Sequence, residues 1–344
     1  MLKAQYKKLT LVFKRPAGTS RGVLKTKDSW LLKIYQSENP HIFGLGECSL
    51  IYGLSPDPVN RYEEKLNELV LNINRYKEVD LSAFPSIRFG LETALTDLLN
   101  GGKKLLFPSS FTEGKSGIPI NGLVWMGNYE FMKKQIIEKL ESGYHCVKLK
   151  IGAINFDKEL DLLKIIRKNF SAEQLELRVD ANGAFAPHEA LDKLKRLSDY
   201  DVHSIEQPVK QGNWETMANL CSRSPVDIAL DEELIGLDDR QIASMLKTIK
   251  PQYIILKPSL TGGLKRSEKI IKIAEAQKTG WWVTSALESN IGLNAIAQWT
   301  ATLNNAMPQG LGTGTLYTNN IPSPLYIHNA NLCFNPAGTW GRQM

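Results

Sequence analysis

The sequence predicts an α/β fold in which a (β/α)8-type barrel, a modified TIM barrel, is joined to a smaller N-terminal α+β domain. The length of 344 residues exceeds the ~250 residues of a typical barrel and leaves room for a second unit. From about residue 117 onward, short apolar runs alternate with amphipathic helical segments, which is the pattern of βαβ units and a parallel sheet. Charged residues recur at the ends of these runs, one strand and one helix apart, which indicates that they meet at one rim.

Residues 1–112 differ from the rest of the chain, because strand-like runs come first and helices follow, as in a separate α+β domain. The runs cover residues 9–14, 29–36 and 41–48, and the helical segments cover residues 60–73 and 86–100. The apolar faces of these helices are most simply the core of this domain.

Residues 113–317 contain the predicted barrel. The apolar runs expected as its strands are 118–124, 146–152, 175–183, 203–208, 226–233, 253–259, 281–287 and 309–314. The helical segments between them include 129–143, 156–170, 187–200, 238–249 and 264–280. An open doubly wound sheet is the alternative, and it would normally carry a glycine-rich dinucleotide turn after its first strand. The one candidate turn, residues 310–315, has Thr315 in place of the third glycine and lies near the end of the chain, so we favour the barrel.

Composition argues against several classes of function. The net charge of +6 comes from lysines spread along the whole chain, so a nucleic-acid partner is not expected. No apolar run reaches the roughly 18 residues that span a bilayer, and the N-terminus lacks the pattern of a signal peptide, so no membrane partner is expected. The four cysteines form no CxxC pair, which argues against a disulfide framework or a zinc site and predicts the cytoplasm.

Three carboxylates end consecutive predicted strands. Asp180 ends the third strand, Glu206 the fourth and Asp231 the fifth. Three carboxylates this close cannot all stay ionised without a cation. Oxygen ligands without histidine or cysteine favour Mg²⁺, so the sequence predicts a magnesium site. Taken singly, each acid could instead be a loop residue or a helix cap.

Three lysines flank the predicted metal site. Lys148 and Lys150 lie two residues apart on the second strand and therefore point to the same face, and Lys257 ends the sixth strand. A lysine near a divalent cation and a second ammonium has its neutral form favoured, which suits a general base. Structural ion pairs with the acids are the alternative, but they explain one lysine more easily than three.

The strand ends together resemble a known family. The segments VKLKIG, LRVDAN, SIEQP, ALDE and ILKPS, in this order, are similar to the enolase superfamily and its muconate-lactonizing subgroup. The segments FGLGEC and RFGLETALTDLL are similar to the capping domain of that subgroup. The resemblance therefore implies that residues 1–112 form a capping domain, closed by the C-terminal segment 318–344, over the catalytic barrel.

Within this subgroup the sequence most resembles the o-succinylbenzoate synthase family, through SALESNIGL and the following GLGTGTLY. The resemblance implies a lyase, a Mg²⁺-dependent dehydratase in which Mn²⁺ can substitute. Its reaction converts 2-succinyl-6-hydroxy-2,4-cyclohexadiene-1-carboxylate to 2-succinylbenzoate in menaquinone biosynthesis, by lysine-mediated α-proton abstraction and an enediolate intermediate, which is the general chemistry of this superfamily. The implied partner is a small-molecule dicarboxylate, and a homo-oligomer stays open.

The same resemblance assigns roles to the lysines. Lys150 would remove the α-proton and then protonate the departing hydroxyl on the same face. Lys257 would lie across the ring and stabilise the anion by its charge and by a cation–π contact. Lys148 would help keep Lys150 neutral and neutralise the substrate carboxylate, and Asn182 would support a lysine or a metal ligand.

The second carboxylate of the substrate needs hydroxyls and backbone donors. The expected binding residues at the seventh and eighth strands are Thr284, Ser285, Gly312 and Thr313, although small residues there could simply fit tight packing. Loops of the first domain would close over the mouth of the barrel. Their expected contacts with the substrate are Arg21 and Tyr52, whereas Glu288 could pair with a lysine or be a surface acid.

Dipeptide epimerases and N-acylamino acid racemases of the same superfamily are the alternatives, and a non-enzymatic binding protein is a remote one. Epimerases usually carry an Asp-x-Asp motif on the eighth strand that binds the ammonium group of the dipeptide. Here the corresponding residues are Gly312, Thr313 and Gly314, which supply no acid. The sequence therefore favours dehydration.

Overall fold

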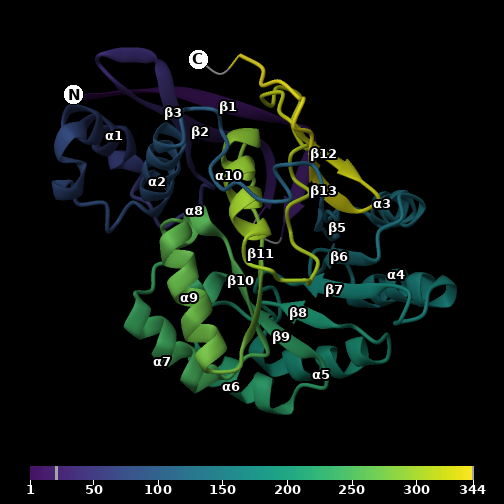
Figure 1. Cartoon of the computed structure of the whole chain (residues 1–344). Helices are drawn as coiled ribbons and strands as arrows, with labels where there is room; N and C mark the ends of the chain where they lie inside the picture. Colours follow the sequence, from purple (N-terminus) through teal and green to yellow (C-terminus); the bar gives the residue numbers. More distant parts are fainter. Residues whose placement is uncertain (20–21, 343–344) are drawn as a thin grey trace.

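The computed structural model describes residues 1–19 and 22–342, which form an antiparallel sheet with helices at one end and a parallel barrel below it (Figure 1). The first sheet has the strand order β1-β2-β3. The elements of this part are β1 (Leu2–Thr19), β2 (Gly22–Gln36), β3 (Asn39–Ser49), η1 (Val59–Arg61), α1 (Tyr62–Leu71), η2 (Ile73–Glu78) and α2 (Pro85–Leu99). The α+β order predicted for the N-terminal region is confirmed.

Alternating side chains bury this sheet on both faces. Trp30 and Leu32 of β2 pack into a hydrophobic cluster with α1 and α2. Leu31, between them, points the other way and packs with Leu45 and with Ile291 of α10 (Asn290–Ala301). Because residues next to each other on a strand face opposite sides, β2 binds its own helices with one face and the barrel with the other.

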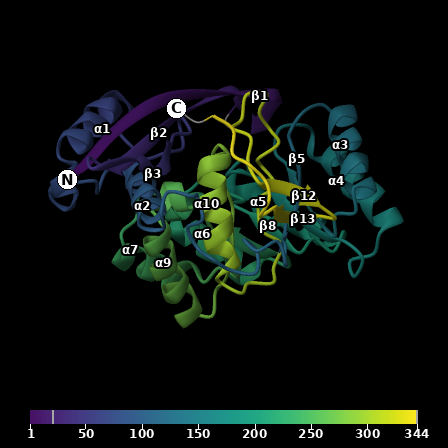
Figure 2. The same ribbon diagram turned by 45° about the horizontal axis from the view of Figure 1, so that its top comes forward.

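Strand β1 extends beyond the first sheet toward the barrel. Figures 1 and 2 show it spanning the top of the molecule, from the side of α1 and α2 toward β5 (Gly122–Val124). Gly18, near its end, forms an antiparallel bridge with Met126, just after β5. A Cβ atom on Gly18 would lie 2.5 Å from the carbonyl oxygen of Met126, so the close approach depends on glycine. The first part of the chain therefore covers the mouth of the barrel.

The barrel contains a curled sheet of seven parallel strands in the order β11-β10-β9-β8-β7-β6-β5. The strands after β5 are β6 (Cys146–Lys150), β7 (Glu176–Asp180), β8 (Ser204–Glu206), β9 (Asp227–Leu230), β10 (Tyr253–Leu256) and β11 (Gly280–Val283). The helices are α3 (Tyr129–Glu141), α4 (Phe156–Asn169), α5 (Pro187–Ser198), α6 (Trp214–Arg223), α7 (Asp239–Ile249), α8 (Pro258–Thr261) and α9 (Leu264–Ala276), followed by α10, with the short η3 (Glu232–Leu234) after β9. No helix in the described part of the chain is long and apolar enough to cross a membrane. The predicted fold class is confirmed.

The eighth strand of the barrel is shorter than the sequence predicts. Of the run 309–314, only Gln309 and Gly310 pair, through parallel bridges to Ile120 and Thr284. The backbone N–H of Gln309 donates to Pro119 over 2.8 Å, and that of Gly310 donates to Val283 over 2.8 Å. These two residues span the gap between β11 and the residues before β5. Beyond them the glycine-rich chain turns, which leaves its backbone donors available at the mouth of the barrel.

The C-terminal segment contacts both parts of the molecule. The backbone N–H of Thr318 donates to Val12 of β1 over 2.9 Å. Farther on, β12 (Leu325–His328) and β13 (Asn331–Phe334) form a hairpin, and β13 pairs with β4 (Ile118–Pro119) at the entry to the barrel.

A buried acid in the first part gives a prediction about stability. Asp57 is 3 % exposed and accepts hydrogen bonds from the backbone N–H and the hydroxyl of Ser86 over 3.1 and 2.7 Å. Burial raises its pKa from 3.8 to about 6, although the bonds from Ser86 oppose the shift. The folded protein therefore holds this proton more tightly than the unfolded chain, and the stability that it contributes is lost as the pH rises from about 4 to above 6.

We expect Asp57→Asn to remove this pH dependence. The free energy of unfolding of the variant, relative to the wild type, should increase by on the order of 2–3 kcal/mol between pH 4 and pH 7.5. Urea unfolding of both proteins at the two pH values measures it, and every other titrating group cancels in the difference. A difference that does not change with pH would contradict the assignment.

Candidate active site

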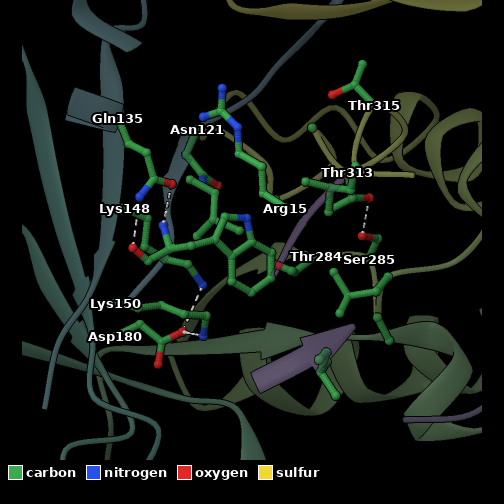
Figure 3. A pocket seen from close by; sticks show the side chains of 18 of the residues that line it. Arg15, Asn121, Gln135, Lys148, Lys150, Asp180, Thr284, Ser285, Thr313 and Thr315 are labelled. Atoms are coloured by element: carbon green, nitrogen blue, oxygen red, sulfur yellow. Dashed lines mark hydrogen bonds and ion pairs between the residues drawn. The ribbon is translucent and has the colours of Figure 1, made fainter. Parts of the chain in front are cut away.

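A cavity of about 520 Å³ lies at the carboxyl ends of the barrel strands, beneath the first part of the chain (Figure 3). Most of the residues that the sequence predicts for the site line it: Lys148, Lys150, Asp180, Asn182, Lys257, Thr284, Ser285, Gly312, Thr313 and Tyr52. Arg21 lies outside the described residues. The cavity joins strand ends from both sides of the barrel, so it is the candidate active site.

The paired lysines reach the cavity because β6 alternates. Val147 and Leu149 belong to the large hydrophobic core, whereas Lys148 and Lys150 point to the other face of the strand and line the cavity. In the register of the sheet, Lys150 pairs with Asp180 of β7. The Lys150 Nζ lies 2.8 Å from Asp180 Oδ2, and the Lys148 Nζ lies 3.2 Å from the same oxygen (Figure 3).

The three carboxylates lie next to one another, as the strand order predicts. Asp180 pairs with Glu206 in the register of β7 and β8, and Asp231 directly follows β9. The Lys148 Nζ donates to Glu206 Oε2 over 2.6 Å. On the other side, Lys257 forms an ion pair with Asp231, and its Nζ lies 4.0 Å from Glu206 Oε1. Acids and lysines therefore alternate around one buried cluster.

Burial and charge shift the pKa values within this cluster. Burial raises the pKa of Asp180, but the ammonium groups of Lys150 and Lys148 outweigh it and hold that pKa below its usual value. Burial lowers the pKa of Lys148, but Glu206 and Asp180 outweigh it and raise that pKa above its usual value. Burial and the charge of Asp180 raise the pKa of Glu206. Glu206 is thus the acid for which a further positive charge would relieve the largest penalty.

The donor set of this cluster fits Mg²⁺. It offers carboxylate oxygens alone, and Glu206 Oε1 is buried without a hydrogen-bond partner among the described residues. As the side chains lie, no group of three acids, histidines or cysteines in residues 1–19 and 22–342 converges on a metal position. Lys148 contacts oxygens of Asp180 and Glu206, and Lys257 contacts an oxygen of Asp231.

Asn182 connects the lysine pair to a further acid. Its side-chain oxygen accepts a hydrogen bond from Lys150 over 2.7 Å, and its Nδ2 donates to Glu232 over 3.1 Å. Its φ of 45° lies in the left-handed region, which asparagine tolerates better than most residues. Sequence reasoning did not select Glu232, although it follows Asp231 directly in the segment LDEE.

The wall at the seventh and eighth strands carries hydroxyl groups. The hydroxyls of Ser285 and Thr313 lie 2.6 Å apart, and Thr284 Oγ1 is buried without a hydrogen-bond partner in the described part of the chain. The chain is close-packed here, because a Cβ on Gly310 would lie 2.4 Å from Thr284 Oγ1. The predicted polar residues thus lie together on one wall of the cavity.

The first part of the chain lines the mouth of the cavity. Tyr52 is half exposed and lines the cavity, and its hydroxyl donates to Asp28 over 2.7 Å. Arg15 of β1 also lines the cavity and lies 3.6 Å from Glu138 of α3 (Figure 3). The sequence placed Arg15 in the segment RPAGTSRG, which was expected to close over the mouth, but selected Arg21 as its contact. Residues 15–19 of that segment belong to strand β1 and not to a loop.

Glu288 is not a surface acid. It is fully buried, and it accepts a hydrogen bond from Ser259 over 2.5 Å, two residues after Lys257. Burial raises its pKa, and the charge of Lys27, itself buried, opposes that shift. Neither of the two alternatives that the sequence left open holds: Glu288 is buried, and within the described residues it forms no ion pair with a lysine.

Comparisons with known proteins agree with this geometry. A family model described as enolase C-terminal domain-like matches residues 132–332. An o-succinylbenzoate synthase from Desulfotalea psychrophila is 49 % identical over 360 residues, covering 95 % of this chain and 97 % of that protein. A crystal structure of MenC from Desulfotalea psychrophila superimposes with a TM-score of 0.87 at 45 % identity, covering 96 % of this chain and 99 % of the other.

A protein named as an epimerase is more distant. A hydrophobic dipeptide epimerase from Enterococcus faecalis is 25 % identical over 307 residues, covering 83 % of this chain and 82 % of that protein. The family model and the 49 % identity over nearly the full length lead to one conclusion: the chain belongs to the o-succinylbenzoate synthase family of the enolase superfamily.

Proposed function

We propose that this chain is a lyase that dehydrates 2-succinyl-6-hydroxy-2,4-cyclohexadiene-1-carboxylate to 2-succinylbenzoate. One observation carries the proposal: Lys150 and Lys257 line the same cavity from strands that lie four places apart in the sheet order, next to the cluster of carboxylates. A flat ring between them would have an amine on each face. Membership of the family supports this substrate.

We infer that Asp180, Glu206 and Asp231 hold Mg²⁺, the metal typical of the superfamily. Their oxygen-only donor set and the unbonded Oε1 of Glu206 support this inference. When bound, the ion would supply positive charge beside the ring carboxylate and so favour loss of the α-proton. Lys148 and Lys257 would then exchange part of their carboxylate contacts for contacts with substrate.

The proposed steps assign one task to each remaining residue. Lys150, as a free amine, takes the α-proton, and the electron pair of that bond moves into the ring carboxylate to give the enediolate. The same pair then forms the new ring double bond as the β-hydroxyl leaves. The ammonium of Lys150 returns the proton to the departing hydroxyl, so that one water is released and the amine is restored. Asn182 orients Lys150 through its 2.7 Å hydrogen bond, and Lys257 stays a cation over the other face of the ring.

The far wall would bind the succinyl carboxylate. The hydroxyls of Thr284, Ser285 and Thr313 and the backbone around Gly312 offer donors without a negative charge. The cations of the cavity also suit a substrate with two carboxylates. The four free cysteines support a reducing compartment, and we place the reaction in the cytoplasm.

A comparison of two substrates tests the proposed function. Epimerization could use the same two lysines, so the binding wall must decide between the reactions. A bound dipeptide would leave its ammonium group without an acid at Gly312, Thr313 and Gly314, which costs at least a few kcal/mol. We expect kcat/KM for the cyclohexadiene to exceed that for unblocked dipeptides such as L-Ala-L-Glu by at least ~10²-fold. A dipeptide preferred over the diene would refute the proposal.

A further inference from the structure

A second cavity, of about 570 Å³, lies outside the candidate active site and shares none of its lining residues. It is formed where α2 of the first part meets the N-terminal ends of α7 and α9. Its lining residues are Arg88, Asp238, Asp239, Arg240, Lys265, Arg266 and Lys269.

The charge of this cavity is strongly unbalanced. Five cations and two acids line it, a net charge of +3, whereas the whole chain carries +6. Both acids are engaged within the fold, because Asp238 accepts the N–H of Gln241 over 2.8 Å as the cap of α7, and Asp239 lies 3.8 Å from Arg266. The residues that line this one cleft therefore carry a net charge half as large as that of the whole chain.

Four of the five cations have no partner. The side chains of Arg88, Arg240, Lys265 and Lys269 are exposed and form no ion pair or hydrogen bond with any residue that the structure describes. Arg266 donates to the backbone of Leu237, but its Nε is buried without an acceptor. Glu92, beside the cleft, attracts Arg88 and Lys265 through its charge, but it forms an ion pair with neither. The five cations of the lining still repel one another, so an anion that entered the cleft would relieve that repulsion.

The cleft is a fixed feature of the junction between the two parts. Glu92 of α2 accepts the backbone N–H groups of Leu264 and Lys265 over 2.7 and 3.0 Å, which joins α2 to the start of α9. A Cβ on Gly262 would lie 3.3 Å from Arg266 Cδ and 3.8 Å from Arg88 Cδ, so the two arginine stems run side by side across the junction. One arginine comes from each part of the molecule.

We propose that this cleft binds a small metabolite that carries two phosphate groups. Arginine presents planar donors that match phosphate oxygens, and lysine adds point charges, so the four exposed cations that form no ion pair suit two dianionic groups rather than one. The hollow lies where three helices meet, which favours a small ligand over a nucleic acid or a membrane, because these need an extended surface. A bound ligand would contact Arg88 from the first part and the other cations from the barrel.

Calorimetry with the Mg²⁺-loaded, full-length protein tests the proposal at constant ionic strength. The probes are fructose, fructose 6-phosphate and fructose 1,6-bisphosphate, which differ only in their phosphate groups. We expect saturable binding of the bisphosphate, at least about tenfold tighter than the monophosphate, and none of the sugar. Lack of saturable bisphosphate binding, or tighter binding of a short oligonucleotide, would overturn the proposal.

Two double variants distinguish binding in the cleft from a general attraction of anions to the net charge of the chain. R240A/K269A removes one cation from α7 and one from α9 inside the cleft, and K247A/K272A removes one exposed lysine from each of the same helices outside it. The first should weaken bisphosphate binding at least about tenfold and the second less than about threefold. Equal effects of the two variants would show that the chain attracts anions only through its net charge. Thermal unfolding without ligand confirms that both variants fold.

Discussion

Replacing Lys150 with alanine should abolish dehydration while the protein stays folded. In the proposed mechanism one amine acts first as base and then as acid, so both steps lose their catalyst together. General acid–base catalysis contributes ~10²–10⁴-fold in a typical step, and we expect kcat to fall by at least ~10³-fold. The side chain is buried in the cluster, yet Asp180 keeps Lys148 as a partner at 3.2 Å, so the fold does not depend on Lys150 alone.

Lys148→Ala should be less damaging than Lys150→Ala. Lys148 bridges Asp180 and Glu206 and would act through charge, not by proton transfer. We expect a drop of about 10–10²-fold that appears partly in KM. Lys164→Ala, on the exposed face of α4, is the matched control and should leave kcat and KM unchanged. Steady-state kinetics with circular dichroism measures all three, and equal defects at positions 148 and 150 would contradict this division of roles.

Removing the metal or one of its proposed ligands should stop turnover. Asp231→Asn takes away one of three oxygen donors and also the ion-pair partner of Lys257. Loss of a direct ligand should weaken Mg²⁺ binding by more than the ~10–100-fold that loss of an outer-shell partner costs. Activity should disappear in excess EDTA and return with Mg²⁺ or Mn²⁺.

The control for this variant is Asp227→Asn, at the exposed start of the same strand, which should bind Mg²⁺ as the wild type does. Calorimetric titration measures the Mg²⁺ affinity of both variants, and it does so independently of catalytic activity. Full turnover in excess EDTA, or unchanged Mg²⁺ affinity of Asp231→Asn, would count against the magnesium site.

The parts of this molecule that sequence analysis predicts are those governed by short-range periodicity. Alternation along β6 sets Lys148 and Lys150 on the face opposite Val147 and Leu149, and the regular spacing of βα units sets Asp180 beside Lys150. These positions follow from the two-residue period of a strand and from the regular spacing of parallel strands, and both can be read from the sequence.

The parts that escaped prediction depend on contacts between distant segments. The eighth strand shrinks to Gln309 and Gly310, because two bridges suffice to close the gap and the glycines that follow favour a turn. Glu288 is buried beside Ser259 and Lys27, which come from other segments and offset part of the cost of burial. The segment that begins at Arg15 was expected to close over the barrel, but which of its side chains lines the cavity depends on the path of β1, which no local pattern encodes.

The positions of the lysines also explain why two like charges are tolerated side by side. Lys148 and Lys150 both donate to the carboxylate of Asp180. Lys148 donates a further hydrogen bond to Glu206, and Lys150 donates one to Asn182. The same contacts keep both amines in fixed positions at the cavity. The ion pairs that hold the two lysines in the fold thus also place them for the proposed chemistry.

The most direct measurement follows the ultraviolet absorbance of the cyclohexadiene substrate as it becomes aromatic, with the wild-type chain and Mg²⁺. We expect rapid loss of the diene, formation of 2-succinylbenzoate in equal amount, and no reaction above the uncatalysed rate with Lys150→Ala. A folded, Mg²⁺-loaded wild-type protein that leaves the diene unchanged, or a Lys150→Ala variant that converts it at the wild-type rate, would contradict this expectation.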